Sequence, residues 1–403
     1  MKIVLVAGAR PNFVKIAPLL HEMKKSARLR PVLVHTGQHY DDAMSGRFFR
    51  DLDIQPPDVN LEVGSGSHAE QTAEVMTRLE PLLSSLEPRL LLVVGDVNST
   101  VAGALTAAKL GISVAHVEAG LRSFDRSMPE EINRVLTDSI SDLLFVTEES
   151  GLENLVREGI HPERIHFVGN LMIDALQTSR ARWQASDIFQ RLGLEETTPF
   201  AFLTLHRPSN VDDGPTRERL LAAVLELSEI LPVLFPVHPR LRDRLSREPV
   251  SWLDAQGIDM LPSSGLFGLP PLGYLDCIAL MSRARFVMTD SGGIQEETTV
   301  LRVPCLTLRE NTERPVTVTS GTNIIVGTDP ARIVEEALWT LLSRPQAPPA
   351  PRLWDGRAAH RIMEVLERLD SVPAASPGQL PRAARAAIRL PRGLVQASRR
   401  DLP

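Results

Sequence analysis

The sequence has only two cysteines in 403 residues, Cys277 and Cys305, and they do not form a metal-binding motif. Each stands in an apolar segment, which predicts buried, reduced thiols. No apolar run approaches the roughly 20 residues that a membrane-spanning helix needs. The chain also passes from Lys2 directly into a strand-like segment rather than into a signal peptide. We therefore predict a globular cytoplasmic protein with no membrane span and no bound metal.

The net charge is uneven along the chain, because acidic residues are almost absent from its end. The formal net charge is −6, yet residues 371–403 hold six arginines against a single acidic residue, Asp401. The remaining residues are therefore more acidic than the total suggests, and acidic domains do not favour contact with nucleic-acid phosphates. We predict no nucleic-acid partner, and we interpret the basic, Pro- and Ala-rich tail at 371–403 as a mobile appendage.

Short apolar segments alternate with helix-like segments, and this pattern occurs twice. Continuous runs of Val, Leu and Ile between helical stretches are typical of parallel strands with both faces covered. The expected strands are 3–7, 31–35, 90–94, 113–117 and 143–146 in the first series, and 200–205, 233–237, 258–261, 286–289, 305–308 and 323–326 in the second. The sequence predicts an α/β protein with two doubly wound domains, each of which would collect ligands at the carboxyl ends of its strands.

The length of the chain favours two domains over one. A helix-like stretch at 174–192, followed by the polar segment 193–199, marks the boundary between the two series of strands. We predict an N-terminal domain of residues 1–171 and a second domain of residues 172–352, with a helix at about 353–370 that packs back on the first domain.

The first expected strand does not end in the glycine fingerprint of dinucleotide-binding proteins, so no NAD cofactor is predicted. It ends in Gly8-Ala-Arg-Pro-Asn-Phe-Val-Lys-Ile-Ala-Pro18. Arg10 and Lys15 flank the start of a helix, where two cations add to the positive end of the helix dipole. Two solvated surface charges are the alternative interpretation.

Carboxylates follow the expected strands at 90–94 and 113–117. Asp96 follows the segment at 90–94, and either a helix cap or a catalytic acid fits that place. Glu118 directly follows an apolar strand, where it has no solvated helix face to occupy. Glu130 and Glu131 follow Pro129 at an expected helix start, where carboxylates are stabilising without any catalytic role.

The second series carries its own polar strand ends. His206 closes the strand at 200–205 and can act as an acid, a base or a donor to phosphate. Ser291, Gly292 and Gly293 form a strand–turn–helix cradle for an anion, and Arg314 adds a further cation. Two carboxylates follow the cradle directly: Glu296, which we interpret as structural, and Glu297.

Together these segments resemble the non-hydrolysing UDP-N-acetylglucosamine 2-epimerase family over about residues 1–370. The resemblance rests on Gly-Ala-Arg-Pro-Asn, Gly-Asp-Val-Asn-Ser-Thr, His-Val-Glu-Ala-Gly-Leu-Arg, Pro-Glu-Glu-Ile-Asn-Arg, Leu-His-Arg, Thr-Asp-Ser-Gly-Gly-Ile-Gln-Glu-Glu and Thr-Glu-Arg-Pro, in that order. It implies the glycosyltransferase-B architecture, in which two Rossmann-like domains enclose a cleft. It also implies reversible C2 epimerisation of UDP-GlcNAc to UDP-ManNAc without a cofactor, through loss and re-addition of UDP at 2-acetamidoglucal.

The resemblance assigns roles to residues of this chain. Asp96, Glu118 and Glu130 would transfer protons, and His206 would assist at the diphosphate. Substrate binding would fall to Arg10, Lys15, Ser291, Gly292, Gly293, Glu297 and Arg314, with Glu297 accepting from the ribose hydroxyls. A homodimer acting in polysaccharide synthesis is implied as well.

The chain departs from the family pattern at Pro208, at Tyr40 after Gly37-Gln38-His39, and at Cys277, where an aromatic residue is usual. Some of these segments serve allosteric activation by a second UDP-GlcNAc in relatives, so the prediction does not include that regulation. Three alternatives stay open: a hydrolysing epimerase, an epimerase of a modified UDP-sugar such as a diacetamido-uronic acid derivative, and a glycosyltransferase or nucleotide-sugar binding protein of the same fold.

Overall fold

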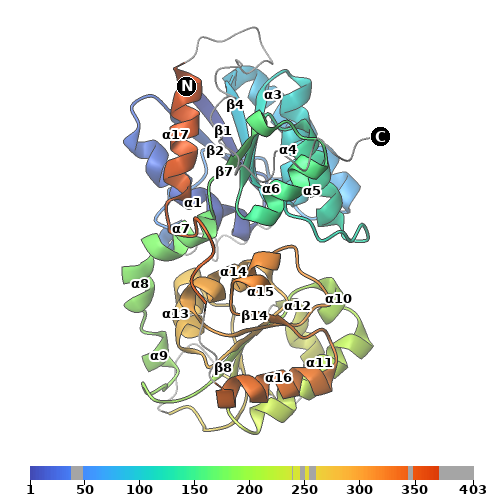
Figure 1. The fold of residues 1–403 in the computed structure, drawn as a ribbon, viewed down its shortest axis with the longest axis vertical. Helices are drawn as coiled ribbons and strands as arrows, with labels where there is room; N and C mark the ends of the chain where they lie inside the picture. Colours follow the sequence, from blue (N-terminus) through green and yellow to red (C-terminus); the bar gives the residue numbers. More distant parts are fainter. Residues whose placement is uncertain (38–48, 238, 246–249, 254–259, 344–347, 372–403) are drawn as a thin grey trace, which may run out of the picture. The chain divides into compact units, whose positions relative to one another are not determined.

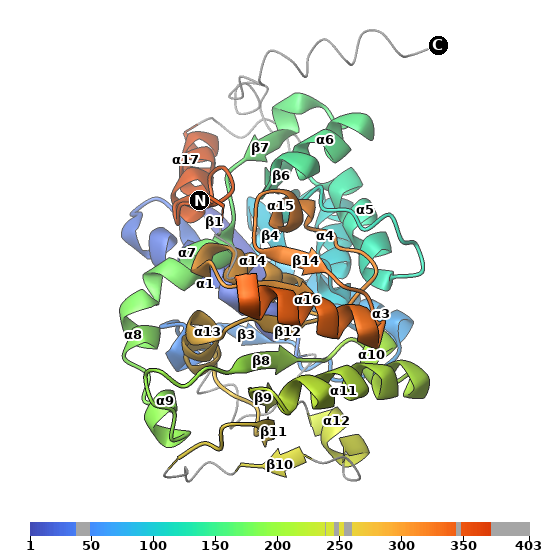
Figure 2. The same ribbon diagram turned by 60° about the horizontal axis from the view of Figure 1, so that its bottom comes forward.

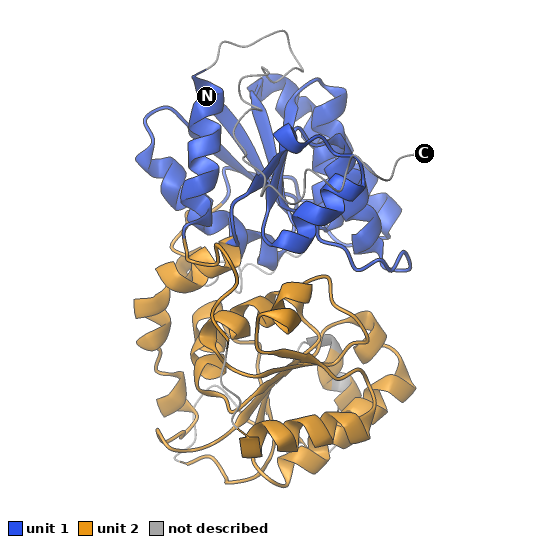
Figure 3. Ribbon diagram, viewed as in Figure 1, with its two compact units in different colours: residues 1–40, 57–170, 357–403 blue, residues 41–56, 171–356 orange. Residues whose placement is uncertain are grey.

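The chain divides into two compact units in a computed structural model that describes residues 1–37, 49–237, 239–245, 250–253, 260–343 and 348–371. Unit 1 consists of the described parts of residues 1–40, 57–170 and 357–403 (Figure 3). Unit 2 consists of the described parts of residues 41–56 and 171–356. The predicted tail at 371–403 lies outside the described residues, apart from Ser371.

Unit 1 is built around a parallel seven-stranded sheet in the order β3-β2-β1-β4-β5-β6-β7 (Figure 1). The strands are β1 (Lys2–Ala7), β2 (Arg30–His35), β3 (Val59–Asn60), β4 (Leu90–Val94), β5 (Ser113–Ala119), β6 (Leu143–Val146) and β7 (Ile165–Phe167). Every residue of β4 and β5 is buried. Strands that are apolar along both faces need cover on both sides, which explains the unbroken apolar runs in the sequence.

Helices cover both faces of this sheet. They are α1 (Arg10–Lys25), α3 (His68–Leu86), α4 (Asn98–Lys109), α5 (Pro129–Ile140), α6 (Glu149–Arg157) and α17 (Ala358–Asp370), with a 3₁₀ turn at Pro162–Arg164. A capping box in which Ser67 and Glu70 bond each other's backbone N–H groups begins α3. The last helix, α17, packs against α1.

Unit 2 repeats the architecture with a second parallel seven-stranded sheet, in the order β10-β11-β9-β8-β12-β13-β14 (Figure 2). Its strands are β8 (Ala201–Thr204), β9 (Pro232–Pro236), β10 (Val250–Trp252), β11 (Gly265–Leu269), β12 (Val287–Thr289), β13 (Cys305–Thr307) and β14 (Asn323–Ile325). Its helices are α7 (Leu171–Thr178), α8 (Arg180–Gln184), α9 (Ile188–Arg191), α10 (Pro208–Val211), α11 (Gly214–Ser228), α12 (Pro239–Arg242), α13 (Tyr274–Arg283), α14 (Gly292–Leu301), α15 (Pro315–Thr319) and α16 (Pro330–Ser343), with a 3₁₀ turn at Asp243–Leu245.

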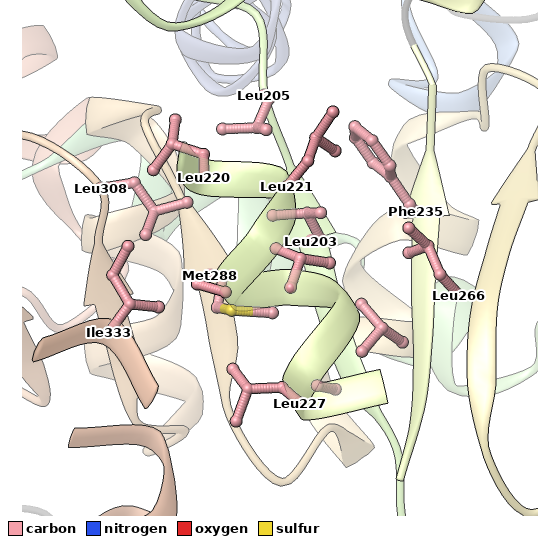
Figure 4. Close-up of a cluster of buried hydrophobic side chains, with 14 of the residues drawn as sticks. Leu203, Leu205, Leu220, Leu221, Leu227, Phe235, Leu266, Met288, Leu308 and Ile333 are labelled. Atoms are coloured by element: carbon pink, nitrogen blue, oxygen red, sulfur yellow. The ribbon is translucent and has the colours of Figure 1, made fainter. Parts of the chain in front are cut away.

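The core of unit 2 lies between its sheet and the helices on each face. On one face, Leu220 and Leu227 of α11 meet Leu203 of β8, Phe235 of β9 and Met288 of β12, all fully buried (Figure 4). On the other face, a second cluster joins the sheet to α13 and to Trp183 of α8. Burying a side chain of this size contributes about 1.5–3 kcal/mol, so these clusters hold the strand ends rigidly in place.

The strand order of each sheet creates one switch point, where the connections that follow two adjacent strands run in opposite directions. In unit 1 this switch lies between β1 and β4, and in unit 2 it lies between β8 and β12. Connections on the two sides of a switch point separate and leave a crevice at the carboxyl ends of the strands, where α/β proteins bind ligands. Each unit therefore has a defined position at which to look for functional side chains.

The predicted class, two doubly wound α/β sheets, is confirmed. One strand prediction was wrong. The segment 258–261 is not a strand at its described residues, Met260 and Leu261, and the strands of that region are β10 and β11. The sequence prediction also missed β3 and β7, because Asn60 and His166 interrupt their short apolar runs.

Candidate active site

Four of the predicted residues gather at the switch point of unit 1. Arg10 begins α1 directly after β1, and Lys15 lies one turn further along that helix. Asp96 follows β4, and Glu118 is the penultimate residue of β5. Because β1, β4 and β5 are neighbours in a parallel sheet, their carboxyl ends bring these side chains to one edge.

Lys15 and Glu118 form a buried ion pair across this edge. The Lys15 ammonium donates a hydrogen bond to Oε2 of Glu118, and both residues are buried. Glu118 has a backbone φ of +70° and interrupts the register between β5 and β6. A bulge turns a side chain away from the direction that the strand would otherwise give it, and an ordinary residue in this conformation is under strain. The structure thus brings a predicted cation and a predicted acid together.

Asp96 is more accessible than Glu118, with 28% of its side chain exposed. Its Oδ2 accepts from Nε of Arg134 at 3.0 Å, and its backbone carbonyl accepts from Nδ2 of Asn133 at 2.9 Å. The N-cap of α4 is Val97 and not Asp96. The capping interpretation of Asp96 is therefore wrong, and α5 holds this carboxylate instead.

The two glutamates at the start of α5 differ in their surroundings. Glu131 is buried and accepts from the backbone N–H groups of Ser123 and Phe124 at 2.9 and 3.0 Å. It also pairs with Arg134. Glu131 therefore has the structural role of closing the loop before α5, while Glu130, one position earlier, is only half-buried. Of these two glutamates, Glu130 is the one that is exposed enough to contact a substrate.

The corresponding residues of unit 2 lie at its own switch point. His206 follows β8 and is half exposed, and its Nδ1 lies 2.9 Å from Oδ1 of Asp290, which follows β12. Asp290 also accepts from the backbone N–H groups of His206 and Arg207 at 3.0 to 3.2 Å. Burial alone would raise the pKa of the Asp290 carboxyl, but these hydrogen bonds and the His206 ring outweigh it and hold that pKa below its ordinary value. With Nδ1 turned to Asp290, Nε2 is the ring nitrogen through which His206 can act on a ligand.

The predicted anion cradle begins α14. Ser291 is its N-cap, with a backbone N–H that donates to Oγ1 of Thr289 at 3.0 Å. Gly292 lies against Arg314, so that a Cβ at this position would approach Cζ of Arg314 to 2.7 Å. Gly293 has more room, because its nearest neighbour is the flexible end of Met172. A side chain at position 292 would therefore displace the Arg314 guanidinium.

Arg314 belongs to a chain of buried charges that the sequence prediction did not foresee. Its Nε pairs with Glu296 at 2.8 Å, and its Nη1 lies 3.6 Å from Glu313. Glu313 also pairs with Arg207 and Arg309 at 3.1 and 2.9 Å. Burial and the two neighbouring arginines lower the pKa of Arg309. Glu296, interpreted as structural, thus acts on Arg314, and three arginines face two glutamates beside the cradle.

Glu297 lies one turn into α14 and is buried. The pKa of the nearby Tyr274 hydroxyl is well above its ordinary value, because the group is buried and because the Glu297 carboxylate lies beside it. Tyr274 begins α13 and was not singled out in the sequence. Cys305 is buried as predicted, whereas Cys277 is only half-buried.

Two residues of the quoted motifs, Asn12 and His116, have roles in the unit 1 site that the sequence did not predict. Asn12 accepts from the N–H groups of Gly8 and Ala9 and donates to the Val94 carbonyl at 3.0 Å, so it ties β1 to β4. His116 and Asp138 form a buried pair behind Glu118. A lone asparagine or histidine in a motif shows its function only when its partners, distant in sequence, are known.

Within the described part of the chain, no group of three or more His, Cys, Asp or Glu side chains could hold a metal ion. None of the helices there is long and apolar enough to cross a membrane. The motif at Gly37-Gln38-His39-Tyr40 lies outside the described residues from Gln38 onward.

Comparison with known proteins identifies the family. A family profile described as UDP-N-acetylglucosamine 2-epimerase matches residues 21–367. UDP-N-acetylglucosamine 2-epimerase from Methanocaldococcus jannaschii is 39% identical over 91% of this chain and 99% of its own. UDP-2,3-diacetamido-2,3-dideoxy-D-glucuronate 2-epimerase from Pseudomonas aeruginosa is 38% identical over 92% and 100% of the two chains.

Solved structures agree with the sequence comparisons. The crystal structure of the M. jannaschii epimerase in complex with UDP-GlcNAc and UDP superposes with a TM-score of 0.81 and 38% identity, covering 91% of this chain and 99% of that one. The epimerase from Neisseria meningitidis, bound to UDP-GlcNAc, has a TM-score of 0.78 and 29% identity over 91% and 100% of the two chains. With a fold of the glycosyltransferase-B type and this identity over nearly its whole folded length, the chain belongs to the UDP-N-acetylglucosamine 2-epimerase family.

Proposed function

We propose that this protein interconverts UDP-GlcNAc and UDP-ManNAc without hydrolysis, by elimination and re-addition of UDP. The observation that carries the proposal is the pair of carboxylates, Asp96 and Glu118, at neighbouring strand ends of unit 1, with Lys15 paired to Glu118. A module that only binds a nucleotide sugar has no need for two acids beside one another at a switch point.

The chemistry requires acids on both faces of the sugar. The proton on C2 is not acidic, because no carbonyl adjoins C2 in the ring. Its removal becomes feasible when a carboxylate takes the proton, the C2–H electron pair forms the C1=C2 bond, and UDP departs with the electron pair of the C1–O bond. UDP then adds back to C1, and a proton returns to C2 from the opposite face. Such proton transfers by positioned carboxylates typically contribute about 10²- to 10⁴-fold in rate.

We assign the proton transfers to Asp96, Glu118 and Glu130. Asp96 is held by Arg134 yet remains partly exposed, as a group that meets substrate must be. Glu118 lies in a bulge that aims its side chain at Lys15. Glu130 is half-buried at the start of the helix that supports Asp96.

The nucleotide end of the substrate is assigned to unit 2. The N-terminus of α14, with Ser291, Gly292 and Gly293, offers backbone N–H groups and a helix dipole to a diphosphate. Arg314, packed against Gly292, and His206 add donors that stabilise the departing charge. Glu297 is assigned to the ribose hydroxyls, and Arg10 of unit 1 to the sugar and the phosphates of the substrate.

The decisive experiment follows C2 of UDP-GlcNAc by NMR in D₂O. Deuterium at C2 in a sugar that still carries UDP, with UDP-ManNAc formed, is the expected result. Free N-acetylmannosamine and UDP would instead establish a hydrolysing enzyme. UDP binding without any exchange would contradict epimerisation of this sugar and favour a binding protein or a glycosyltransferase.

A second substrate has a specific observation in its favour. The P. aeruginosa relative that acts on UDP-2,3-diacetamido-2,3-dideoxy-D-glucuronate is 38% identical to this chain, against 39% for the M. jannaschii enzyme. Sequence identity therefore does not show which of the two UDP-sugars is the substrate. The same D₂O assay with both UDP-sugars, compared by kcat/KM, decides between them. A homodimer and a cytoplasmic location stay predictions that come from the resemblance and from the sequence.

A further inference from the structure

His116 is a fully buried histidine in the middle of unit 1, in the strand that carries Glu118. Its Nδ1 lies 2.6 Å from Oδ1 of Asp138, and its Nε2 lies 2.8 Å from the carbonyl oxygen of Gly95. Both ring nitrogens are therefore within short hydrogen-bond distance of oxygen atoms. Asp138 comes from α5, and Gly95 directly precedes Asp96.

These two contacts fix the orientation of the ring. A carbonyl oxygen can only accept, so Nε2 must donate to Gly95. Oδ2 of Asp138 already accepts from the N–H of Gly120 at 3.0 Å and pairs with Arg122 at 2.7 Å. The other carboxyl oxygen, Oδ1, is the one that meets Nδ1 of His116.

The Nε2 hydrogen bond acts on the peptide unit that joins Gly95 to Asp96. The N–H of Gly95 donates to the Val117 carbonyl at 3.1 Å, so the residue is held at both ends. Gly95 has a φ of +73°, and a Cβ there would lie 3.3 to 3.7 Å from Asn12, Glu118 and Lys15. The backbone thus makes a left-handed turn directly before Asp96, a conformation that glycine adopts without strain.

Asp138 extends the same support to the neighbouring strand end. It binds the N–H of Gly120, two residues after Glu118, at 3.0 Å. Arg122, which is buried, links Asp138 to Glu158. The His116–Asp138 pair is therefore bonded to the chain just before Asp96 and just after Glu118, the two carboxylates assigned to proton transfer.

We propose that His116 is a positioning residue, held between Asp138 and Gly95, which orients the Gly95–Asp96 peptide and with it the Asp96 carboxylate. The proposal rests on the proposed function where it concerns rate, but its structural content does not depend on that function. A positioning error of about 1 Å can cost on the order of 10²-fold in rate, so the hydrogen bond to Gly95 has a measurable consequence.

Two substitutions separate the two ends of the ring. In His116→Gln the side-chain amide reaches about as far as Nε2 and can still donate to Gly95. In His116→Asn the amide lies where Nδ1 was, keeps the bond to Asp138 and loses Gly95. His166→Asn is the matched control, because His166 is also buried in the sheet of unit 1 and its pKa is lowered to about 4, mainly by burial.

The experiment measures the full-length protein by ¹⁵N NMR and by the C2 exchange assay. The Asp96 amide resonance is expected to move in His116→Asn but not in His116→Gln. We expect kcat to fall 10- to 100-fold in His116→Asn with KM changed less than threefold, while His116→Gln keeps most of kcat. His166→Asn should lose stability but not rate.

Two results would overturn the proposal: an Asp96 amide resonance that does not move in His116→Asn, or equal rate losses in both His116 variants. The NMR result decides the matter even if the protein proves inactive on UDP-GlcNAc. If His116→Asn does not fold, a loss of most of kcat in a folded His116→Gln would overturn the proposal.

Discussion

Asp96 and Glu118 occupy neighbouring strand ends but differ in how the fold holds them. Glu118 is buried against Lys15 with a φ of +70°, whereas Asp96 keeps 28% of its side chain exposed and is steadied by Arg134. A strained and buried carboxylate is sensitive to any change in its neighbours. Asp96 therefore offers the cleaner test of proton transfer by a single residue.

Asp96→Asn is expected to lower C2 exchange by about 10²- to 10⁴-fold, because an amide cannot take or return the proton. UDP binding, measured by calorimetry, should change little, since the nucleotide is assigned to unit 2. Asp187→Asn is the matched control, because Asp187 forms a surface ion pair with Arg191. Full activity in Asp96→Asn would remove Asp96 from the proposed mechanism.

Gly292→Ala tests the close approach of Arg314 to the anion cradle. The added Cβ would lie 2.7 Å from Cζ of Arg314, so the guanidinium must move away from the start of α14. We expect the Kd for UDP to rise tenfold or more, which corresponds to about 1.4 kcal/mol. Gly214→Ala is the control, because a Cβ there meets its nearest neighbour, Nη2 of Arg217, at an ordinary 3.8 Å. Unchanged UDP affinity in Gly292→Ala would contradict the assignment of Arg314.

At the scale of elements, a polar side chain fastens each sheet across its switch point, and in unit 1 it is Asn12, which ties β1 to β4. In unit 2 this is Asp290 after β12, which binds the two N–H groups that follow β8 and the side chain of Asn210. Its lowered pKa links the integrity of this strand end to pH. The stabilisation is complete above the unfolded pKa of about 3.9 and is lost as the pH falls through the lower folded value.

Asp290→Asn should therefore flatten the acid limb of the stability profile. We expect urea unfolding to show that the substitution costs about 1–3 kcal/mol at pH 7, because buried donors lose a charged acceptor. The difference from the unsubstituted protein should shrink towards pH 3. Asp212→Asn, which removes a surface ion pair with Arg244, should leave the profile nearly unchanged. Parallel curves for Asp290→Asn and the unsubstituted protein over the whole range would refute this linkage.

The strands also show which elements can be predicted from sequence patterns. The apolar runs of β1, β4 and β5 predicted these strands because helices cover both faces of the sheet. The strands β3, β7, β10 and β11 were not predicted, because a polar residue or a glycine interrupts the apolar run of each. Sheet order and hydrogen bonding hold such short strands in place, and neither can be read from a single segment.

At the scale of the whole molecule, the last helix belongs to the first unit. In α17, Ile362, Leu366 and Leu369 are fully buried, and the helix packs against α1. Arg28 pairs with Asp370 at 3.1 Å, and Arg89 donates to the Leu369 carbonyl at 3.1 Å. The sequence neighbours of α17 on its N-terminal side belong to unit 2, so the chain returns to unit 1 only after the second sheet is complete.

Two truncations compare the contribution of α17 with that of the predicted tail at 371–403. A chain that ends at Ser371 keeps the backbone N–H of Ser371, which bonds the Glu367 carbonyl at the end of α17, and should retain its melting temperature and its turnover. A chain that ends at Gly356 lacks α17 and should lose several kcal/mol, since each buried aliphatic side chain contributes about 1.5–3 kcal/mol. Calorimetric melting of both proteins measures the difference. A large loss of turnover in the longer chain would show that the basic tail has a function.

The sequence by itself determined the two α/β series, the family and the positions of Lys15, Asp96 and Glu118 at strand ends, because these depend on local periodicity and on contiguous motifs. The tertiary structure decided the partners of those residues. The pairing of Lys15 with Glu118, of Arg314 with Glu296, and of His116 with Asp138 joins segments that the sheet order brings together from distant parts of the chain. A motif indicates which residue is important, but the packing of the folded chain determines which charged side chain it contacts.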